Sequence, residues 1–192
     1  MRHLSAIIVL TLAFITSGQS AAADKMTVLL DWFINPDHAP LYVGLERGYF
    51  REAGLDVEFI APADPNDPPK LVAAGKADLA VSYQPQLHMH ADRGLPLVRV
   101  ATLVATPLNS LVVLQDGPIK SLSDLKGKTV GFSVGGFEDA MLRSMLQKNG
   151  LTLKDIKLVN VNFSLSPALI SGKVDAVIGA YRNFELNQLD IL

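Results

Sequence analysis

One segment of this chain occurs twice, and this repeat constrains the fold more than any other feature of the sequence. Residues 74–83, AGKADLAVSY, return as SGKVDAVIGAY at residues 171–181. Self-similarity of this kind indicates a duplicated structural unit. We therefore expect two units that are built on one plan.

The same order of patterns precedes both copies. A polar helical run stops at a Gly-Leu pair, at Gly54 in the first unit and at Gly150 in the second, and an apolar run follows. An opening strand begins at Thr27 in the first unit and at Thr129 in the second. Strands that alternate with helices predict an α/β fold with two β-α-β lobes and mainly parallel sheets. The glycines suit the left-handed residue that ends a helix.

The two units also suggest where the lobes begin and end. We predict a first lobe over residues 24–109, and a crossover strand and second lobe over residues 110–192. The first unit continues with a helix at 85–94 and a strand near 97–104, which the second unit lacks. We therefore expect the first lobe to be incomplete without a C-terminal return, the second lobe to be truncated, and a C-terminal part to be missing.

The first 23 residues have the pattern of a secretory signal peptide. Arg2 and His3 precede the apolar run AIIVLTLAFIT, which is too short to span a bilayer, and three alanines at 21–23 offer small residues for cleavage. The sequence thus predicts export, with the mature protein in the periplasm.

Composition excludes several classes of function. The chain has no cysteine, which excludes disulfides, thiolate metal sites and cysteine nucleophiles. Its net charge is −2 and it has no long basic run, which argues against a nucleic-acid partner. His88 and His90 lie two residues apart on a predicted helix and would point apart, so we interpret them as surface histidines rather than a metal pair.

Four loops follow strands of the predicted sheets. They are DWFINPDH at 31–38, the loop at Tyr83, SVGGFEDA at 133–140 and YRNFE at 181–185. Ligands of parallel sheets bind outside the carboxyl ends of the strands, so we expect these loops to face one cleft. The candidate ligand-binding residues are Asp31, Trp32, Asn35, His38, Tyr83, Gly135, Gly136, Phe137, Tyr181, Asn183 and Glu185. No catalytic residue and no metal ligand is predicted among them.

The residue types in these loops suit a flat, nitrogen-bearing ring. Aromatic faces can stack on such a ring while carboxylates and amides bind its edge. Other interpretations remain open from the residues alone. Trp32 can fill a core, Tyr83 and Tyr181 can be structural partners of the repeated strand, and Glu185 can be a solvated helix residue. The Gly-Gly pair can be a tight turn, or it can present backbone N–H groups to an acceptor.

Three segments resemble the NMT1/THI5-like family, most closely its periplasmic thiamine-pyrimidine precursor binding proteins. They are LLDWFINPDHAPLYVGLERGYFREAGLDVEF, GKADLAVSY and GAYRNFE, and the similarity runs from about residue 26 to 185. The resemblance implies a type II periplasmic binding protein-like fold, two lobes that close on a 4-amino-5-substituted 2-methylpyrimidine, no cofactor, and delivery to the permease of an ABC importer. Trp32 and the tyrosines would stack on the ring, while Asp31, Asn35 and Glu185 would meet its amino group and ring nitrogens.

The same family contains a pyrimidine synthase, which is the first alternative. It is similar to this chain through GKADLAV, but it uses a lysine just after that strand to hold pyridoxal phosphate and a histidine four residues later. Those positions fall on Ser82 and Gln86 here. Serine forms no Schiff base and glutamine has no imidazole, so we expect a protein that is not an enzyme. The second alternative is the same fold with a sulfonate or a flavin precursor, and the carboxylate of Glu185 opposes a sulfonate because like charges repel.

Overall fold

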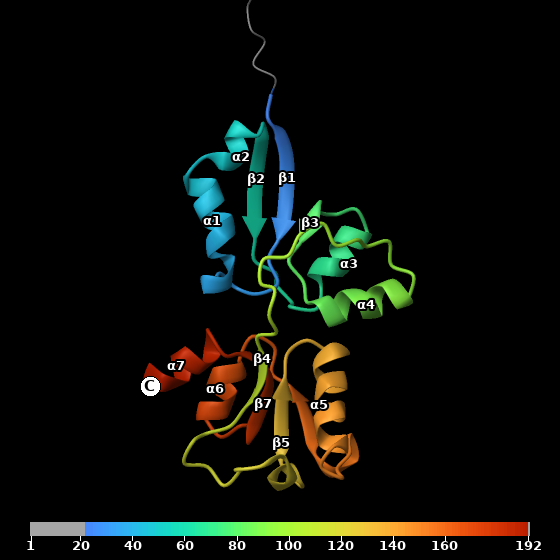
Figure 1. Cartoon of the computed structure of the whole chain (residues 1–192), viewed down its shortest axis with the longest axis vertical. Helices are drawn as coiled ribbons and strands as arrows, with labels where there is room; N and C mark the ends of the chain where they lie inside the picture. Colours follow the sequence, from blue (N-terminus) through green and yellow to red (C-terminus); the bar gives the residue numbers. More distant parts are fainter. Residues whose placement is uncertain (1–21, 192) are drawn as a thin grey trace, which may run out of the picture.

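The computed structural model describes residues 22–191, which form two α/β lobes, one above the other in Figure 1. The predicted signal peptide, residues 1–23, lies outside the described residues except for Ala22 and Ala23. None of the helices between residues 22 and 191 combines the length and the apolar character that a membrane span requires.

The first lobe is built on a parallel sheet with the strand order β2-β1-β3. Helices and a short 3-10 turn connect the strands and follow the last one. In chain order the elements are β1 (Asp24–Leu29), η1 (Pro36–His38), α1 (Ala39–Glu46), α2 (Tyr49–Glu52), β2 (Leu55–Ile60), α3 (Pro68–Ala73), β3 (Leu79–Ala80) and α4 (Gln84–Asp92).

The second lobe is built on a sheet with the order β4-β7-β5-β6, in which β4 is antiparallel to β7 and the other pairs are parallel. In chain order its elements are β4 (Asn109–Val112), η2 (Leu122–Leu125), β5 (Thr129–Phe132), α5 (Phe137–Gln147), η3 (Leu153–Asp155), β6 (Lys157–Asn160), α6 (Leu165–Ile170), β7 (Ala176–Tyr181) and α7 (Glu185–Ile191). From β5 to β7 it repeats the plan of β1 to β3, as the sequence predicts.

The aspartate of the repeated Gly-Lys-x-Asp motif explains why the motif occurs in both lobes. In the first lobe Thr27 N donates to Asp78 Oδ2 at 2.7 Å, and in the second lobe Thr129 N donates to Asp175 Oδ2 at 2.8 Å. In each lobe the backbone N–H of the same aspartate donates to the carbonyl of the same threonine. Each aspartate therefore fixes the start of the third strand beside the first. The motif glycine takes a positive φ, 67° and 68° in the two copies, and so ends the preceding helix.

Helices cover both faces of the second sheet. One buried cluster joins β7 to α6 through Val177, Leu165 and Leu169, and a second joins it to α5 through Ile178, Leu142 and Leu146. A strand that is buried on both faces reads as a continuous apolar run, which is the pattern of AVI in the repeat.

The predicted strand at 97–104 is wrong. These residues adopt no strand, and the side chains of Val98 and Val100 are 83% and 71% exposed. A strand forms only where a neighbouring backbone completes its hydrogen bonds. Within the described part of the chain, β3 has two residues and pairs only with β1, so no ladder reaches this segment.

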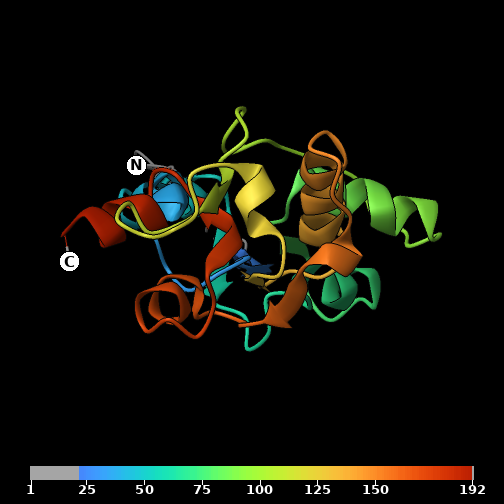
Figure 2. The same ribbon diagram turned by 90° about the horizontal axis from the view of Figure 1, so that it is seen from below.

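The interpretation of both histidines of α4 as surface residues is wrong for His90. His88 is exposed, but His90 is 7% exposed and burial lowers its pKa. Residues two positions apart on a helix point about 200° apart around its axis, so one histidine faces inward when the other faces solvent. Figure 2 shows this helix beside α5 of the second lobe, which it contacts.

Candidate functional site

The carboxyl ends of the parallel strands in the two sheets face each other. In Figure 1 the arrows of β1 and β2 point down and that of β5 points up, so the loops that follow the strands meet between the lobes. A narrow cleft lies there, and together with the solvent at its mouth it measures about 290 Å³. Its lining consists of Asp31, Trp32, Asn35, Tyr83, Glu138, Leu165, Gly179, Tyr181, Phe184 and Glu185. Six of the predicted site residues are among them.

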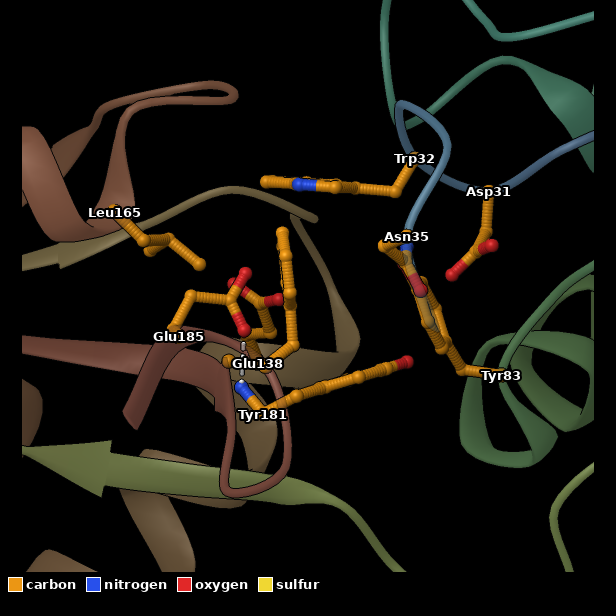
Figure 3. A pocket seen from close by; sticks show the side chains of 10 residues that line it. Asp31, Trp32, Asn35, Tyr83, Glu138, Leu165, Tyr181 and Glu185 are labelled. Carbon is orange, nitrogen blue, oxygen red and sulfur yellow. Dashed lines mark hydrogen bonds between the residues drawn. The ribbon is translucent and has the colours of Figure 1, made fainter. Parts of the chain in front are cut away.

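Aromatic side chains from both lobes form the walls of the cleft. Trp32 follows β1 and Tyr181 ends β7, and Figure 3 shows them on opposite sides of the space. The ring of Tyr83 stands edge-on to that of Tyr181, with centroids 6.2 Å apart and an interplanar angle of 86°. Burial raises the pKa of both tyrosines, and the nearby Asp31 raises it further, so both hydroxyls stay protonated at neutral pH.

Trp32 also contributes to a core, as its alternative interpretation proposed. It is 6% exposed and packs into the α6 side of the second lobe, where the ring of Phe163 meets it edge-on at 4.7 Å. Its indole Nε1 is buried and has no hydrogen-bond partner. A buried donor without a partner carries a free-energy cost that a ligand acceptor would remove.

Asp31 is held in place by a residue behind it. His38 Nε2 lies 2.7 Å from Asp31 Oδ1, and Asn35 N donates to His38 Nδ1 at 3.3 Å. Because Nδ1 accepts a hydrogen bond, Nε2 carries the proton and donates it to Asp31. His38 is 1% exposed and does not line the cleft, so it positions a cleft residue instead of facing the space itself.

Glu138, in the first turn of α5, lines the cleft although it was not predicted. Its Oε2 accepts from Ser133 N at 2.8 Å and from Val134 N at 3.1 Å, and the residue is 2% exposed. Burial raises the pKa of Glu138 to about 8, although the two N–H donors lower it. The available signal was a carboxylate two residues after a Gly-Gly pair, in the first turn of a helix.

Glu185 begins α7 and points into the cleft between Trp32 and Tyr181 (Figure 3). Its Oε2 accepts from Tyr181 N at 2.7 Å, which ties the carboxylate to the end of β7. The residue is 6% exposed, and burial raises its pKa to about 7. It is therefore not the solvated helix residue of the alternative interpretation.

Five predicted residues do not line the cleft, and four residues of the lining were missed. The first group is His38, Gly135, Gly136, Phe137 and Asn183, and the second is Glu138, Leu165, Gly179 and Phe184. Phe137 is 1% exposed, and its ring packs against that of Tyr83 at a centroid distance of 5.0 Å and a tilt of 32°. Asn183 bridges the lobes, because its Nδ2 donates to Asp37 Oδ1 at 2.6 Å. Among residues 22–191, no three His, Asp or Glu side chains come together to hold a metal ion.

The sequence matches the family described as NMT1/THI5 like over residues 35–192. A Haemophilus influenzae protein named for thiamine biosynthesis is 61% identical over 170 residues, which is 88% of this chain and 54% of that protein. The formylaminopyrimidine-binding protein of Halalkalibacterium halodurans is 39% identical over 170 residues, 88% of this chain and 52% of that protein. A 4-amino-5-hydroxymethyl-2-methylpyrimidine phosphate synthase of Uromyces fabae is 34% identical over 159 residues, 82% of this chain and 46% of the synthase. This chain spans about half the length of these relatives.

Solved structures of periplasmic binding proteins share the fold. The alkanesulfonate-binding protein of Xanthomonas axonopodis superposes with a TM-score of 0.66 at 18% identity, over 84% of this chain and 56% of that one. The periplasmic aliphatic sulphonate-binding protein of Escherichia coli gives a TM-score of 0.59 at 22% identity, over 81% and 53%. The expected periplasmic binding protein-like fold is confirmed, and at these identities the likeness shows the fold alone.

Proposed function

Because this chain belongs to the NMT1/THI5-like family, we propose that it is part of the solute-binding component of an ABC importer and that it binds an aminopyrimidine precursor of thiamine. Formylaminopyrimidine and hydroxymethylpyrimidine are the candidate ligands. The protein holds the ligand between its lobes in the periplasm and delivers it to the permease in the inner membrane.

The observation that carries this proposal is the combination of aromatic walls and carboxyl groups in one cleft. Trp32 and Tyr181 offer ring faces on opposite sides, and Glu185 points between them. A flat ring can stack on these faces. Its exocyclic amino group and a ring nitrogen can then form two hydrogen bonds with the carboxyl group of Glu185.

The positions that would carry the synthase's reactive groups support binding without catalysis. Ser82 Oγ donates to Gln86 Oε1 at 2.8 Å, so the two side chains lie together at the end of β3. Neither side chain can form a Schiff base with pyridoxal phosphate or act as an imidazole. We therefore favour a binding protein over a synthase, although synthases are among the relatives.

The lack of basic side chains among the described residues of the cleft lining opposes a sulfonate ligand. Asp31, Glu138 and Glu185 line the cleft, and its described lining contains no lysine or arginine. A sulfonate would be a buried negative charge in a site of low dielectric whose described walls offer no cationic partner, which carries a large free-energy cost. The fold alone, which sulfonate-binding proteins share, does not outweigh this argument.

Calorimetry on the full-length protein tests the proposal. We expect formylaminopyrimidine or hydroxymethylpyrimidine to bind with one site per chain, and native mass spectrometry to detect the pyrimidine when the protein is purified from its host. Absence of binding for both pyrimidines, or tighter binding of an alkanesulfonate, would refute the proposed ligand.

A further inference from the structure

Four consecutive backbone N–H groups precede and begin α5, and side chains of this chain occupy all of them. Glu138 Oε2 accepts from Ser133 N and Val134 N at 2.8 and 3.1 Å. The other two donors are Gly135 N, bound by Asn66 Oδ1 at 2.9 Å, and Gly136 N, bound by Asp139 Oδ1 at 2.6 Å.

Such a run of donors is chemically an anion site. Consecutive N–H groups at the start of an 11-residue helix, together with the positive end of its dipole, favour a phosphate, sulfonate or carboxylate. In this chain the carboxyl group of Glu138 accepts from Ser133 N and Val134 N. These two residues are both fully buried.

The second lobe is shaped to keep this carboxyl group where it is. Gly179 in β7 has a φ of 100°, and a Cβ atom there would overlap the Glu138 carboxyl group. A glycine in a strand interior often marks the close approach of another group. Glu138 is thus held between the start of α5 and β7, and it still lines the cleft.

We propose that Glu138 determines the specificity of the cleft: its carboxyl group occupies the position that would otherwise hold an anionic group of the ligand, so the cleft takes a neutral or cationic ring and excludes phosphorylated and sulfonated ones. The identity of the ring rests on the proposed function, but the exclusion of anions does not. Asp31 and Glu185 strengthen the exclusion from the other walls.

The test compares 4-amino-5-hydroxymethyl-2-methylpyrimidine with its phosphate ester by calorimetry on the full-length protein. We expect the unmutated protein to bind the phosphate ester about tenfold or more weakly than the alcohol, since the ester would face buried carboxyl groups. Glu138→Ala frees the N–H groups of Ser133 and Val134, so the ratio of the two affinities should change by about tenfold or more in favour of the ester.

Glu46→Ala is the matched control, because Glu46 is an exposed residue of α1. It should leave the ratio unchanged. If Glu138→Ala and the unmutated protein have the same ratio of affinities for the alcohol and the phosphate ester, the inference is overturned.

Inorganic sulfate keeps the inference testable if Glu138→Ala does not fold. Sulfate should not displace the pyrimidine from the unmutated protein, and displacement would overturn the inference. If neither formylaminopyrimidine nor the alcohol binds, the proposed function fails, and sulfate alone then decides the question in a thermal melt. Stabilisation of Glu138→Ala but not of the unmutated protein supports the exclusion of anions, and any other pattern overturns it.

Discussion

Gly179 lies against the carboxyl group of Glu138 so closely that no side chain fits between them. Gly179 lies in β7, within the repeated segment of the second lobe, and Glu138 is the second residue of α5, 41 positions earlier in the chain. Their contact joins β7 to α5 directly beneath the cleft, so the packing of the lobe and the shape of the site depend on the same two residues.

Gly179→Ala should destabilise the protein by about 2–4 kcal/mol, because overpacking adds to the strain of a positive φ. Gly127→Ala is the matched control, since Gly127 has a φ of 76° but open space around its Cβ position. It should show the cost of strain alone. Urea denaturation measures both, and in a Glu138→Ala background the cost of Gly179→Ala should fall to that of the control. Strictly additive effects would mean that the two residues do not interact.

Trp32→Ala should weaken pyrimidine binding by roughly 1–3 kcal/mol, the range for stacking of a base on an aromatic side chain. Calorimetry on the full-length protein measures the loss. Tyr49→Ala serves as a control, because this aromatic side chain is 58% exposed on α2 and does not line the cleft. Unchanged affinity in Trp32→Ala would leave Trp32 only its packing role against Phe163.

The affinity for an aminopyrimidine should fall as the pH rises above about 7, where Glu185 loses its proton in the free protein. The hydrogen bond between this carboxyl group and a ring nitrogen requires one proton, which either group can carry. Above this pH the free protein has lost that proton, so binding has to take one up, and affinity falls by up to about tenfold per pH unit. Calorimetry at alkaline pH in two buffers of different ionisation enthalpy should detect this uptake. In Glu185→Gln the uptake should be absent, and binding at neutral pH should be weaker by about 1–3 kcal/mol. Equal proton uptake by both proteins would assign the titration to another group.

Glu138 should make the protein less stable at alkaline pH. Its pKa is about 8 in the folded protein against an ordinary value of 4.5, so the folded state binds the proton more tightly than the unfolded chain. The stabilising contribution is fully present below about 4.5 and is lost as the pH rises through about 8. In Glu138→Gln the free energy of unfolding should therefore decrease less over this range, as followed by urea denaturation at several pH values. Glu46→Gln, at an exposed position, is the control and should show the same pH dependence of unfolding free energy as the unmutated protein. The same pH dependence in Glu138→Gln would show that the Glu138 carboxyl group does not cause it.

The sequence by itself determined the architecture and the loops of the site. The repeated Gly-Lys-x-Asp motif predicts the lobes because Asp78 and Asp175 each bond to the first strand of their own lobe, which is a local requirement of one β-α-β unit. The rule that ligands lie at the carboxyl ends of parallel strands then selected Asp31, Tyr83 and Glu185.

Only the tertiary structure decided which side chain of each loop faces the cleft. Sequence reasoning chose His38 and Phe137, but His38 lies behind Asp31 and Phe137 is buried beside the missed Glu138. Neighbouring residues in a first helical turn point about 100° apart, so their roles depend on how the turn is rotated against the sheet. That rotation follows from contacts between distant segments, such as the one between Glu138 and Gly179, which no local pattern of residues encodes.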